Sequence, residues 1–164
     1  MSSDISANQT SVVIVMSEFN GKITENLLKG ALDAFSHHGG LEPDIHIYRA
    51  PGAFEIPGTI VQIMQNHTPD AIVALGAVIR GETPHFDFIS GESARGIAEL
   101  SRNSDIPIIN GILTTDTAQQ AVDRSQVGGR NKGWDAMEAA LKTISVYQSL
   151  RTASKCCPGF FLLP

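Results

Sequence analysis

Residues 71–79 form the feature that most limits what this chain folds into. All nine residues are uncharged, and several of them are β-branched. A continuous apolar run of this kind is typical of a strand that is buried on both faces of a parallel sheet. Gly81, Thr83-Pro84 and His85 follow, and a helical pattern begins at the histidine. The segment therefore predicts a buried strand that ends in a ligand-binding loop and the start of a helix.

Three more runs have the character of strands, namely residues 11–16, 44–49 and 106–109. The second of them alternates polar and apolar residues, so we expect it to be less deeply buried. Stretches with helical apolar periodicity lie between and after the strands, in residues 23–35, 60–64, 89–100, 119–122 and 134–147. Strands that alternate with helices, without a hairpin signal, indicate right-handed crossovers and a parallel sheet.

The predicted fold is α/β, a three-layer α/β/α sandwich with a four-stranded parallel sheet. We expect one domain over residues 1–164, because a chain of this length buries most of its apolar surface in a single core. Residues 1–10 are polar and are expected to form a loose arm. Residues 151–164 show no clear pattern, and no role is assigned to this tail.

Composition and charge exclude several classes of function. The net charge of −5 argues against a nucleic-acid binder, which would carry a basic patch. The only cysteines, Cys156 and Cys157, are adjacent, which indicates neither a disulfide framework nor a zinc site and favours a reducing compartment. No secretory signal is visible, and the apolar runs are far shorter than the ~20 residues of a membrane helix. We expect a cytoplasmic protein without membrane, nucleic-acid or metal partners.

Ligands of open parallel sheets bind beyond the carboxyl ends of the strands. Here that rule selects four segments, which are Ser17–Gly21, Ala50–Pro57, Ala77–His85 and Asn110–Thr115. Three of the four are rich in glycine, proline or polar residues. Their convergence predicts a binding site at this edge of the sheet.

The segment Gly81-Glu82-Thr83 precedes a helix start, where backbone N–H groups suit an oxyanion such as phosphate. A plain strand-to-helix turn is the alternative. His85 lies in the first turn of that helix, where an imidazole suits proton transfer near pH 7. A solvent-facing or capping histidine is equally consistent with the sequence.

Several other side chains have two readings. Phe19 is either a platform for a planar heterocycle or a displaced core residue, and Glu55 is either a substrate acceptor or a paired structural acid. Arg124, Arg130 and Lys132 gather around a glycine break, where they suit either a phosphate or a solvated surface. No phosphate-loop or dinucleotide-binding motif is present. These residues alone indicate a cofactor-free enzyme or a binder of a small anionic ligand.

Six motifs in order resemble the 6,7-dimethyl-8-ribityllumazine synthase family, over roughly residues 11–150. They are Phe19-Asn20 with Ile23-Thr24, Pro51–Pro57, Leu75–Thr83, His85-Phe86-Asp87, Gly111–Thr115 and Asn131-Lys132-Gly133. The resemblance implies a four-stranded parallel sheet between helices, assembled as a homopentamer and in some members as an icosahedral capsid. It further implies condensation of 5-amino-6-(D-ribitylamino)uracil with 3,4-dihydroxy-2-butanone 4-phosphate, without cofactor, in riboflavin biosynthesis. Riboflavin synthase is the partner that this pathway suggests.

The resemblance also implies a role for each matched residue. Phe19 resembles the ring that stacks on the pyrimidine, and His85 resembles the proton-transfer residue. The other pyrimidine and ribityl contacts fall on Asn20, Ala53, Phe54, Glu55, Ala77, Val78, Ile79 and Asn110. The phosphate contacts fall on Gly81, Glu82, Thr83, Arg124 and Lys132, of which Arg124 and Lys132 come from a neighbouring subunit.

Asn110 departs from the family pattern, because many members carry an aromatic residue there that reaches the substrate across the subunit interface. An amide hydrogen-bonds instead of stacking, which is expected to change the affinity for the pyrimidine. The alternative function is a catalytically weak relative that binds a flavin or lumazine, or that acts as a scaffold assembly.

Overall fold

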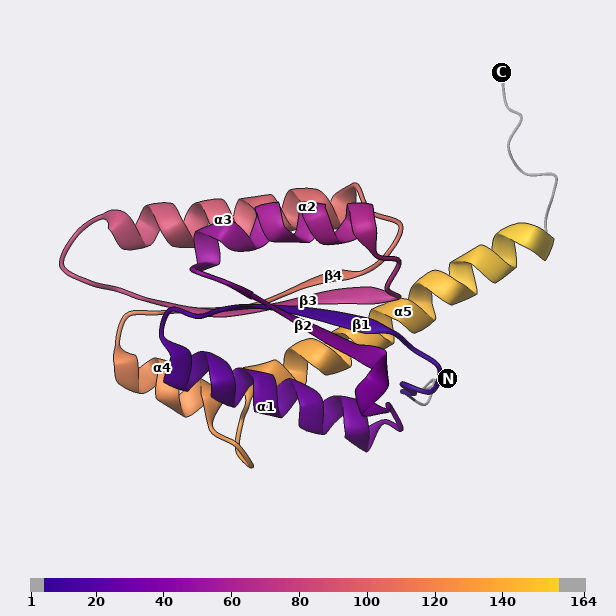
Figure 1. The fold of residues 1–164 in the computed structure, drawn as a ribbon, viewed down its shortest axis with the longest axis horizontal. Coiled ribbons are helices and arrows are strands. Elements are labelled where there is room, and N and C mark those ends of the chain that lie inside the picture. Colours follow the sequence, from indigo (N-terminus) through magenta and orange to yellow (C-terminus); the bar gives the residue numbers. More distant parts are fainter. Residues whose placement is uncertain (1–4, 157–164) are drawn as a thin grey trace, which may run out of the picture.

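A four-stranded sheet lies between two layers of helices in the computed structural model, which describes residues 5–156 (Figure 1). The strands are β1 (Val12–Ser17), β2 (Ile45–Ala50), β3 (Ala71–Ile79) and β4 (Ile108–Thr115). The helices are α1 (Gly21–His37), α2 (Ile56–Asn66), α3 (His85–Arg102), α4 (Ala118–Ser125) and α5 (Lys132–Cys156), with short 3-10 turns η1 (Glu42–Asp44) and η2 (Ala53–Glu55). The α/β/α prediction is confirmed.

All strand pairs are parallel, in the order β2-β1-β3-β4. Every residue of β1 is buried, as are the first seven residues of β3, because helices cover both faces of these central strands. The edge strand β2 is partly exposed, as its alternating sequence predicted. The apolar run 71–79 thus forms the central strand that leads to the candidate site.

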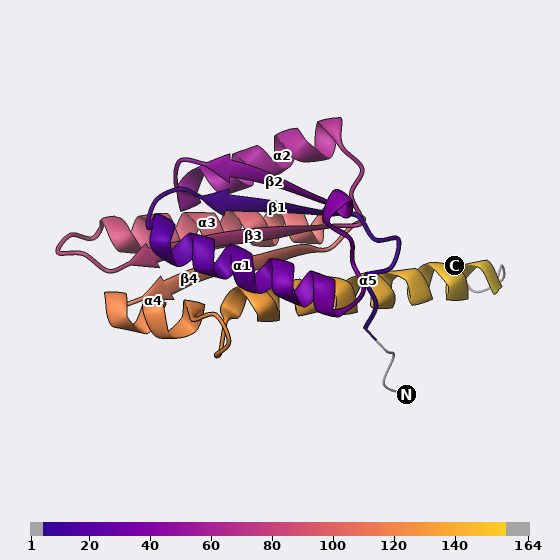
Figure 2. The same cartoon turned by 60° about the horizontal axis from the view of Figure 1, so that its bottom comes forward.

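Helices α1, α4 and α5 cover one face of the sheet, and α2 and α3 cover the other (Figures 1 and 2). Two separate apolar cores result from this arrangement. Ile14 and Met16 of β1 pack with α1 and α5, whereas Val13 and Val15 of the same strand pack with α2 and α3. Consecutive residues of β1 therefore point into different cores, as expected because side chains of a strand alternate between its two faces.

The predicted end of the fourth strand was wrong. Residues 110–115 do not leave the sheet but continue β4, with Asn110 opposite Ala74 and Thr115 opposite Ile79. Asn110-Gly111 has the composition of a turn, yet Gly111 instead allows β4 to lie close to β3 and α5. A Cβ atom there would lie 2.9 Å from the Ala74 carbonyl oxygen and 3.0 Å from the Ala136 Cβ.

Both ends of the described chain differ from their predictions. Helix α5 continues through residues 151–156 and projects beyond the sheet (Figure 2), whereas residues 157–164 lie outside the described part. Residues 5–10 are not a loose arm, because Ala7 is fully buried and its N–H donates to the His38 carbonyl at 2.8 Å. No helix within residues 5–156 is long and apolar enough to span a membrane.

Helices α1 and α5 meet at a buried asparagine. Asn131 donates to the carbonyl oxygens of Asn26 and Ser125 at 2.8 and 2.9 Å, and it accepts from the Gly133 N–H at 2.8 Å. Gly133 lies so close to α1 that any Cβ atom would overlap the Leu27 carbonyl. The start of α5 is therefore held against α1 by a side chain and by direct backbone contact.

Candidate functional site

A cavity of about 550 Å³ lies at the carboxyl ends of the strands. Its lining includes Phe19, Ala53, Phe54, Glu55, Ala77, Val78, Ile79, Gly81, Thr83 and His85, which the sequence had singled out. Pro51, Gly52, Phe86 and Ile89 complete the wall. Three of the four predicted segments therefore converge on one cavity, as the rule for parallel sheets expects.

Two aromatic rings stand at this cavity rather than in the core. Phe19 is 71% exposed and Phe54 is 53% exposed. The loop that carries Phe19 is held in place because the Phe19 N–H donates to the Pro51 carbonyl at 3.2 Å. Exposed rings on a fixed loop present flat apolar faces to a ligand, so the structure excludes the reading of Phe19 as a core residue.

Asn20 supports the cavity rather than lining it. It has a left-handed backbone conformation (φ 60°) just before α1, which asparagine tolerates well. Its Nδ2 atom donates to the Ala77 carbonyl at 2.8 Å and so fastens the start of α1 to the end of β3. The amide thereby fixes the strand edge formed by Ala77, Val78 and Ile79.

Glu55 is exposed at the end of the turn η2, and its carboxylate lies over Gly52. A Cβ atom on Gly52 would come within 2.9 Å of the Glu55 Oε2 atom, so any larger residue displaces the carboxylate. Gly52 has an extended backbone (φ −145°), which alanine adopts without strain. Gly52 therefore leaves room for the carboxylate in this position, although its own backbone conformation does not require glycine.

Changing Gly52 to alanine is expected to weaken binding of a ligand hydroxyl by Glu55 without unfolding the protein. A hydrogen bond to a charged group contributes about 1.5–3 kcal/mol, so the Kd of a polyhydroxylated pyrimidine should rise about tenfold. The measurement is a fluorescence titration, with Gly58→Ala as the control because nothing lies within 4 Å of that Cβ position. Equal affinity in the two variants would show that ligand binding does not depend on this position of the Glu55 carboxylate.

The loop after β3 brings Gly81, Thr83 and His85 to the cavity, whereas Glu82 is not part of the lining. Helix α3 begins at His85 without a side-chain N-cap. The first N–H groups of a helix have no partner within the helix, and an uncapped start offers them to an anion. The loop therefore has the chemistry of a phosphate site next to an imidazole.

Asn110 does not line this cavity, and its predicted contact with the substrate across a subunit interface stays a prediction. It lies in the middle of β4, where its Oδ1 accepts from the Ile112 N–H at 3.0 Å. It lines a second cavity of about 390 Å³ between α3 and β4. Phe86 lines both cavities and forms the wall between them.

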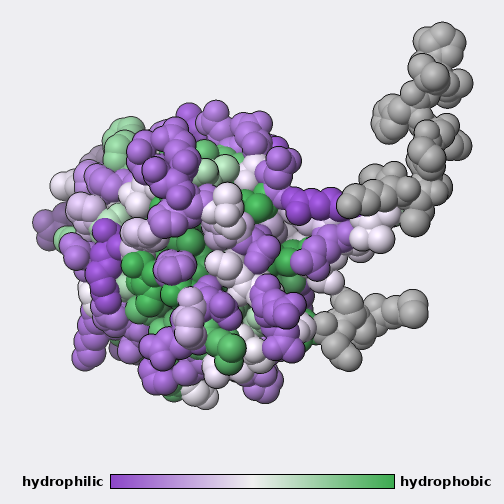
Figure 3. Space-filling view, turned by 45° about the vertical axis from the view of Figure 1, so that its right-hand side comes forward, coloured by the Kyte–Doolittle hydropathy of each residue, from purple (hydrophilic) through white to green (hydrophobic). Residues whose placement is uncertain are grey.

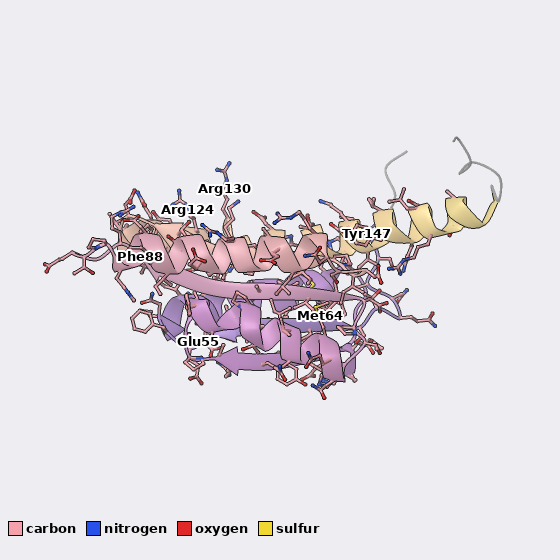
Figure 4. The ribbon with its side chains drawn as sticks, turned by 90° about the horizontal axis from the view of Figure 1, so that it is seen from above. Glu55, Met64, Phe88, Arg124, Arg130 and Tyr147 are labelled. Carbon is pink, nitrogen blue, oxygen red and sulfur yellow. The ribbon has the colours of Figure 1, made fainter. Side chains whose placement is uncertain are left out.

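The predicted phosphate-binding cations also lie elsewhere. Arg124 of α4 donates to the Gln120 carbonyl at 3.0 Å, and Lys132 pairs with Asp135 at 2.7 Å. Arg124 belongs to α4, which covers the face of the sheet opposite to α3, and Figure 4 shows it well apart from Glu55. The cavity lining that the described residues form includes no lysine or arginine. A single chain thus supplies the aromatic, backbone and imidazole groups, but not the cations.

A family profile described as 6,7-dimethyl-8-ribityllumazine synthase matches residues 9–148. The chain belongs to this family. Three proteins with that name are similar to it along most of their length. The one from Chloroherpeton thalassium is 43% identical over 147 residues, which cover 90% of this chain and 95% of the relative. Those from Chlorobium limicola and Campylobacter jejuni are 41% and 42% identical and cover 88% and 87% of this chain and 93% of each relative.

The lumazine synthase match contains every element that forms the cavity, from β1 to the start of α3. Sequence reasoning missed the contribution of Phe86 and Ile89. A signal for them exists, since they follow His85 by one and four residues, and positions three or four apart on a helix share one face. Within residues 5–156 no group of three or more His, Cys, Asp or Glu side chains is arranged to hold a metal ion.

Proposed function

We propose that this chain is a 6,7-dimethyl-8-ribityllumazine synthase. It condenses 5-amino-6-(D-ribitylamino)uracil with 3,4-dihydroxy-2-butanone 4-phosphate and releases phosphate and water. The observation that carries the proposal is one cavity that combines exposed aromatic rings, an uncapped helix start and His85, in a chain of this family. A transferase of this kind acts in riboflavin biosynthesis.

The pyrimidine occupies the wall formed by Phe19 and the end of β3. Its ring stacks on Phe19, and the backbone of Ala77, Val78 and Ile79 reads its polar edge. Asn20 acts by holding that edge in place through the Ala77 carbonyl. The ribityl chain extends along Ala53, Phe54 and Glu55, where the carboxylate accepts a hydrogen bond from a hydroxyl group.

The phosphorylated ketone is bound by the loop before α3. Gly81 and Thr83 face its phosphate, with Glu82 at the outer rim of the loop. The uracil amine attacks the ketone carbon, water leaves to give an imine, and the imine then loses phosphate to leave an enol. The enol becomes a ketone, and the ribitylamino nitrogen attacks that carbonyl and closes the second ring with loss of a second water. His85 transfers protons during these steps, and positioning of the two substrates supplies much of the rate enhancement.

The complete site requires a second copy of the chain. A phosphate dianion in a partly desolvated cavity calls for a cation, and the lining of this cavity has none among the described residues. Arg124 and Lys132 of a neighbouring chain supply it, and the neighbour's Asn110 faces the pyrimidine. Exposed apolar residues, among them Ile47 and Val122, and an apolar area within a hydrophilic surface (Figure 3) support self-association.

The remaining features of the proposal follow the family. The chain is one domain, works in the cytoplasm without a cofactor, and assembles as a homopentamer or as an icosahedral capsid. Its product is passed to riboflavin synthase. Light scattering of the purified protein distinguishes the pentamer from the capsid by mass.

The decisive experiment mixes both substrates with the purified protein and follows the fluorescence of the lumazine. The proposed function requires product formation well above the spontaneous rate, with release of one phosphate per product. Formation at the spontaneous rate, together with tight lumazine binding, would instead identify the chain as a binding or scaffold protein.

Replacing Arg124 by alanine is expected to impair use of the phosphorylated ketone. Charge-assisted hydrogen bonds contribute about 1.5–3 kcal/mol, so kcat/KM for this substrate should fall about 10–10²-fold. The KM for the pyrimidine should stay the same. The matched control is Arg130→Ala, since Arg130 is also exposed near the glycine break but has no assigned role. An equal effect of both changes would contradict the assignment.

A further inference from the structure

Arg80 connects three elements around the loop that leads to His85. It follows β3, and its backbone N–H donates to the Thr115 carbonyl at the end of β4 at 2.9 Å. Its Nε atom bonds to Asp116 Oδ1 at 2.9 Å, just before α4. Its Nη1 atom lies 3.1 Å from Asp87 Oδ1 in the first turn of α3. One side chain therefore ties the ends of β3 and β4 to the start of α3.

The same guanidinium lies against the wall of the cavity. The Arg80 Cζ atom is 4.1 Å from the centroid of the Phe86 ring, a cation–π arrangement. Phe86 lines the substrate cavity, whereas Arg80 lines only the second cavity behind it. Arg80 is thus placed to orient the wall without contacting a ligand in the substrate cavity.

The loop of residues 81–84 has few other contacts. These residues are all exposed, and neither Glu82 nor Thr83 makes a side-chain hydrogen bond or ion pair within the described part of the chain. The Arg80–Asp87 pair joins the two ends of this loop across six residues, 81–86. Closing a loop lowers the number of conformations that it samples, and a ligand then orders less chain when it binds.

Electrostatics favour the same arrangement. The hydrogen bond to Asp116, assisted by Asp87, raises the pKa of Arg80, so the guanidinium remains charged at any physiological pH. The two carboxylates flank a loop that is suited to an anion. Their pairing with Arg80 offsets a negative charge that would otherwise repel phosphate.

We propose that Arg80 is a positioning residue for the reaction. It holds the loop 81–84 and the Phe86 ring in the geometry that aligns the phosphorylated ketone with His85. This role rests on the proposed function, since it concerns the substrate of that reaction. Lysine does not replace arginine here, because an ammonium group lacks the planar fork that bonds two carboxylates while it stacks on a ring.

The test compares Arg80→Lys, which keeps the charge, with Asp87→Asn, which removes the charge that Asp87 contributes to the link with α3. Arg95→Ala is the control, because Arg95 is an exposed arginine of α3 that pairs with Glu92 away from the loop. We expect kcat/KM for the phosphorylated ketone to fall about tenfold or more in both variants, since small misplacements of reacting groups are costly. The Kd of the pyrimidine should change less than about twofold, as Phe19 is untouched.

A second measurement does not depend on activity. Amide hydrogen exchange of a peptide that spans residues 81–86 should become faster in Arg80→Lys and Asp87→Asn, and remain unchanged in Arg95→Ala. Faster exchange together with the selective kinetic loss supports the proposal. If the unaltered protein forms no lumazine, the proposed function is wrong, yet the exchange result still decides whether Arg80 holds the loop.

Three outcomes would overturn the positioning role. The first is unchanged exchange in Arg80→Lys, and the second is kinetics for this variant that match the unaltered protein. The third is an equal loss for both substrates with a lower melting temperature, which would identify Arg80 as a stability residue only.

Discussion

Replacement of His85 by alanine is expected to lower kcat by about 10²-fold or more, since a positioned proton-transfer group typically contributes 10²–10⁴-fold. The KM values of both substrates should change far less, because the aromatic and phosphate contacts remain. His85 is exposed at the cavity, so its removal leaves no void in the core. Steady-state kinetics at several pH values, followed by lumazine fluorescence, measure the effect.

His46→Ala is the matched control, because His46 is an exposed histidine of β2 that does not line the cavity. Added imidazole should restore part of the activity of His85→Ala by entering the space that the side chain vacates. An unchanged rate in His85→Ala would remove the proton-transfer role while leaving the binding assignments intact. A drop in substrate affinity with unchanged kcat would make His85 a binding residue.

Changing Gly133 to alanine is expected to produce the largest loss of stability. The new methyl group would overlap the Leu27 carbonyl, and a backbone atom in the middle of α1 does not move aside as a flexible side chain does. Overpacking costs about 1–3 kcal/mol and occasionally more, and this contact belongs at the upper end. A loss of about 3 kcal/mol lowers the melting temperature by roughly 6–12 °C for a chain of this size.

Gly58→Ala separates this steric effect from the general effect of alanine on helices. Gly58 lies within α2 with open space at its Cβ position, so alanine should leave stability unchanged or raise it by about 0.5–1 kcal/mol. Thermal unfolding of both variants by circular dichroism measures the difference. Equal melting temperatures would contradict the close backbone contact between α1 and α5.

The strands and most helices were predictable because the spacing of apolar residues along the chain indicates which faces of each element are buried. Residues 71–79 are apolar on both sides because helices cover both faces of the sheet. The predicted end of the fourth strand was wrong because Asn110-Gly111 suits either a turn or a strand that lies close to a helix. Only the position of Ala136 in the fold decides between the two. Likewise, nothing local to residues 151–156 indicated that α5 continues through them.

The part of the candidate site that lies at strand ends was predictable from the sequence. Contacts between residues far apart in the chain were not. Phe19, Phe54 and His85 follow strands of one sheet, so topology alone brings them together. The link from Arg80 to Asp116 joins residues 36 positions apart, and no periodicity signals it. Under the proposed function, Arg124 and Lys132 contact the substrate from a neighbouring chain, and the pattern of one chain does not contain such a contact.

The central place of β1 has a consequence for synthesis of the protein. This strand is made first, yet both of its partners come later, since β2 ends at Ala50 and β3 ends at Ile79. Until both partner strands have left the ribosome, this buried and mainly apolar strand has at least one unpaired edge, which favours aggregation of nascent chains. Chains truncated between β2 and β3 should therefore accumulate in inclusion bodies, and a chaperone that holds residues 12–17 should raise the yield of the complete protein.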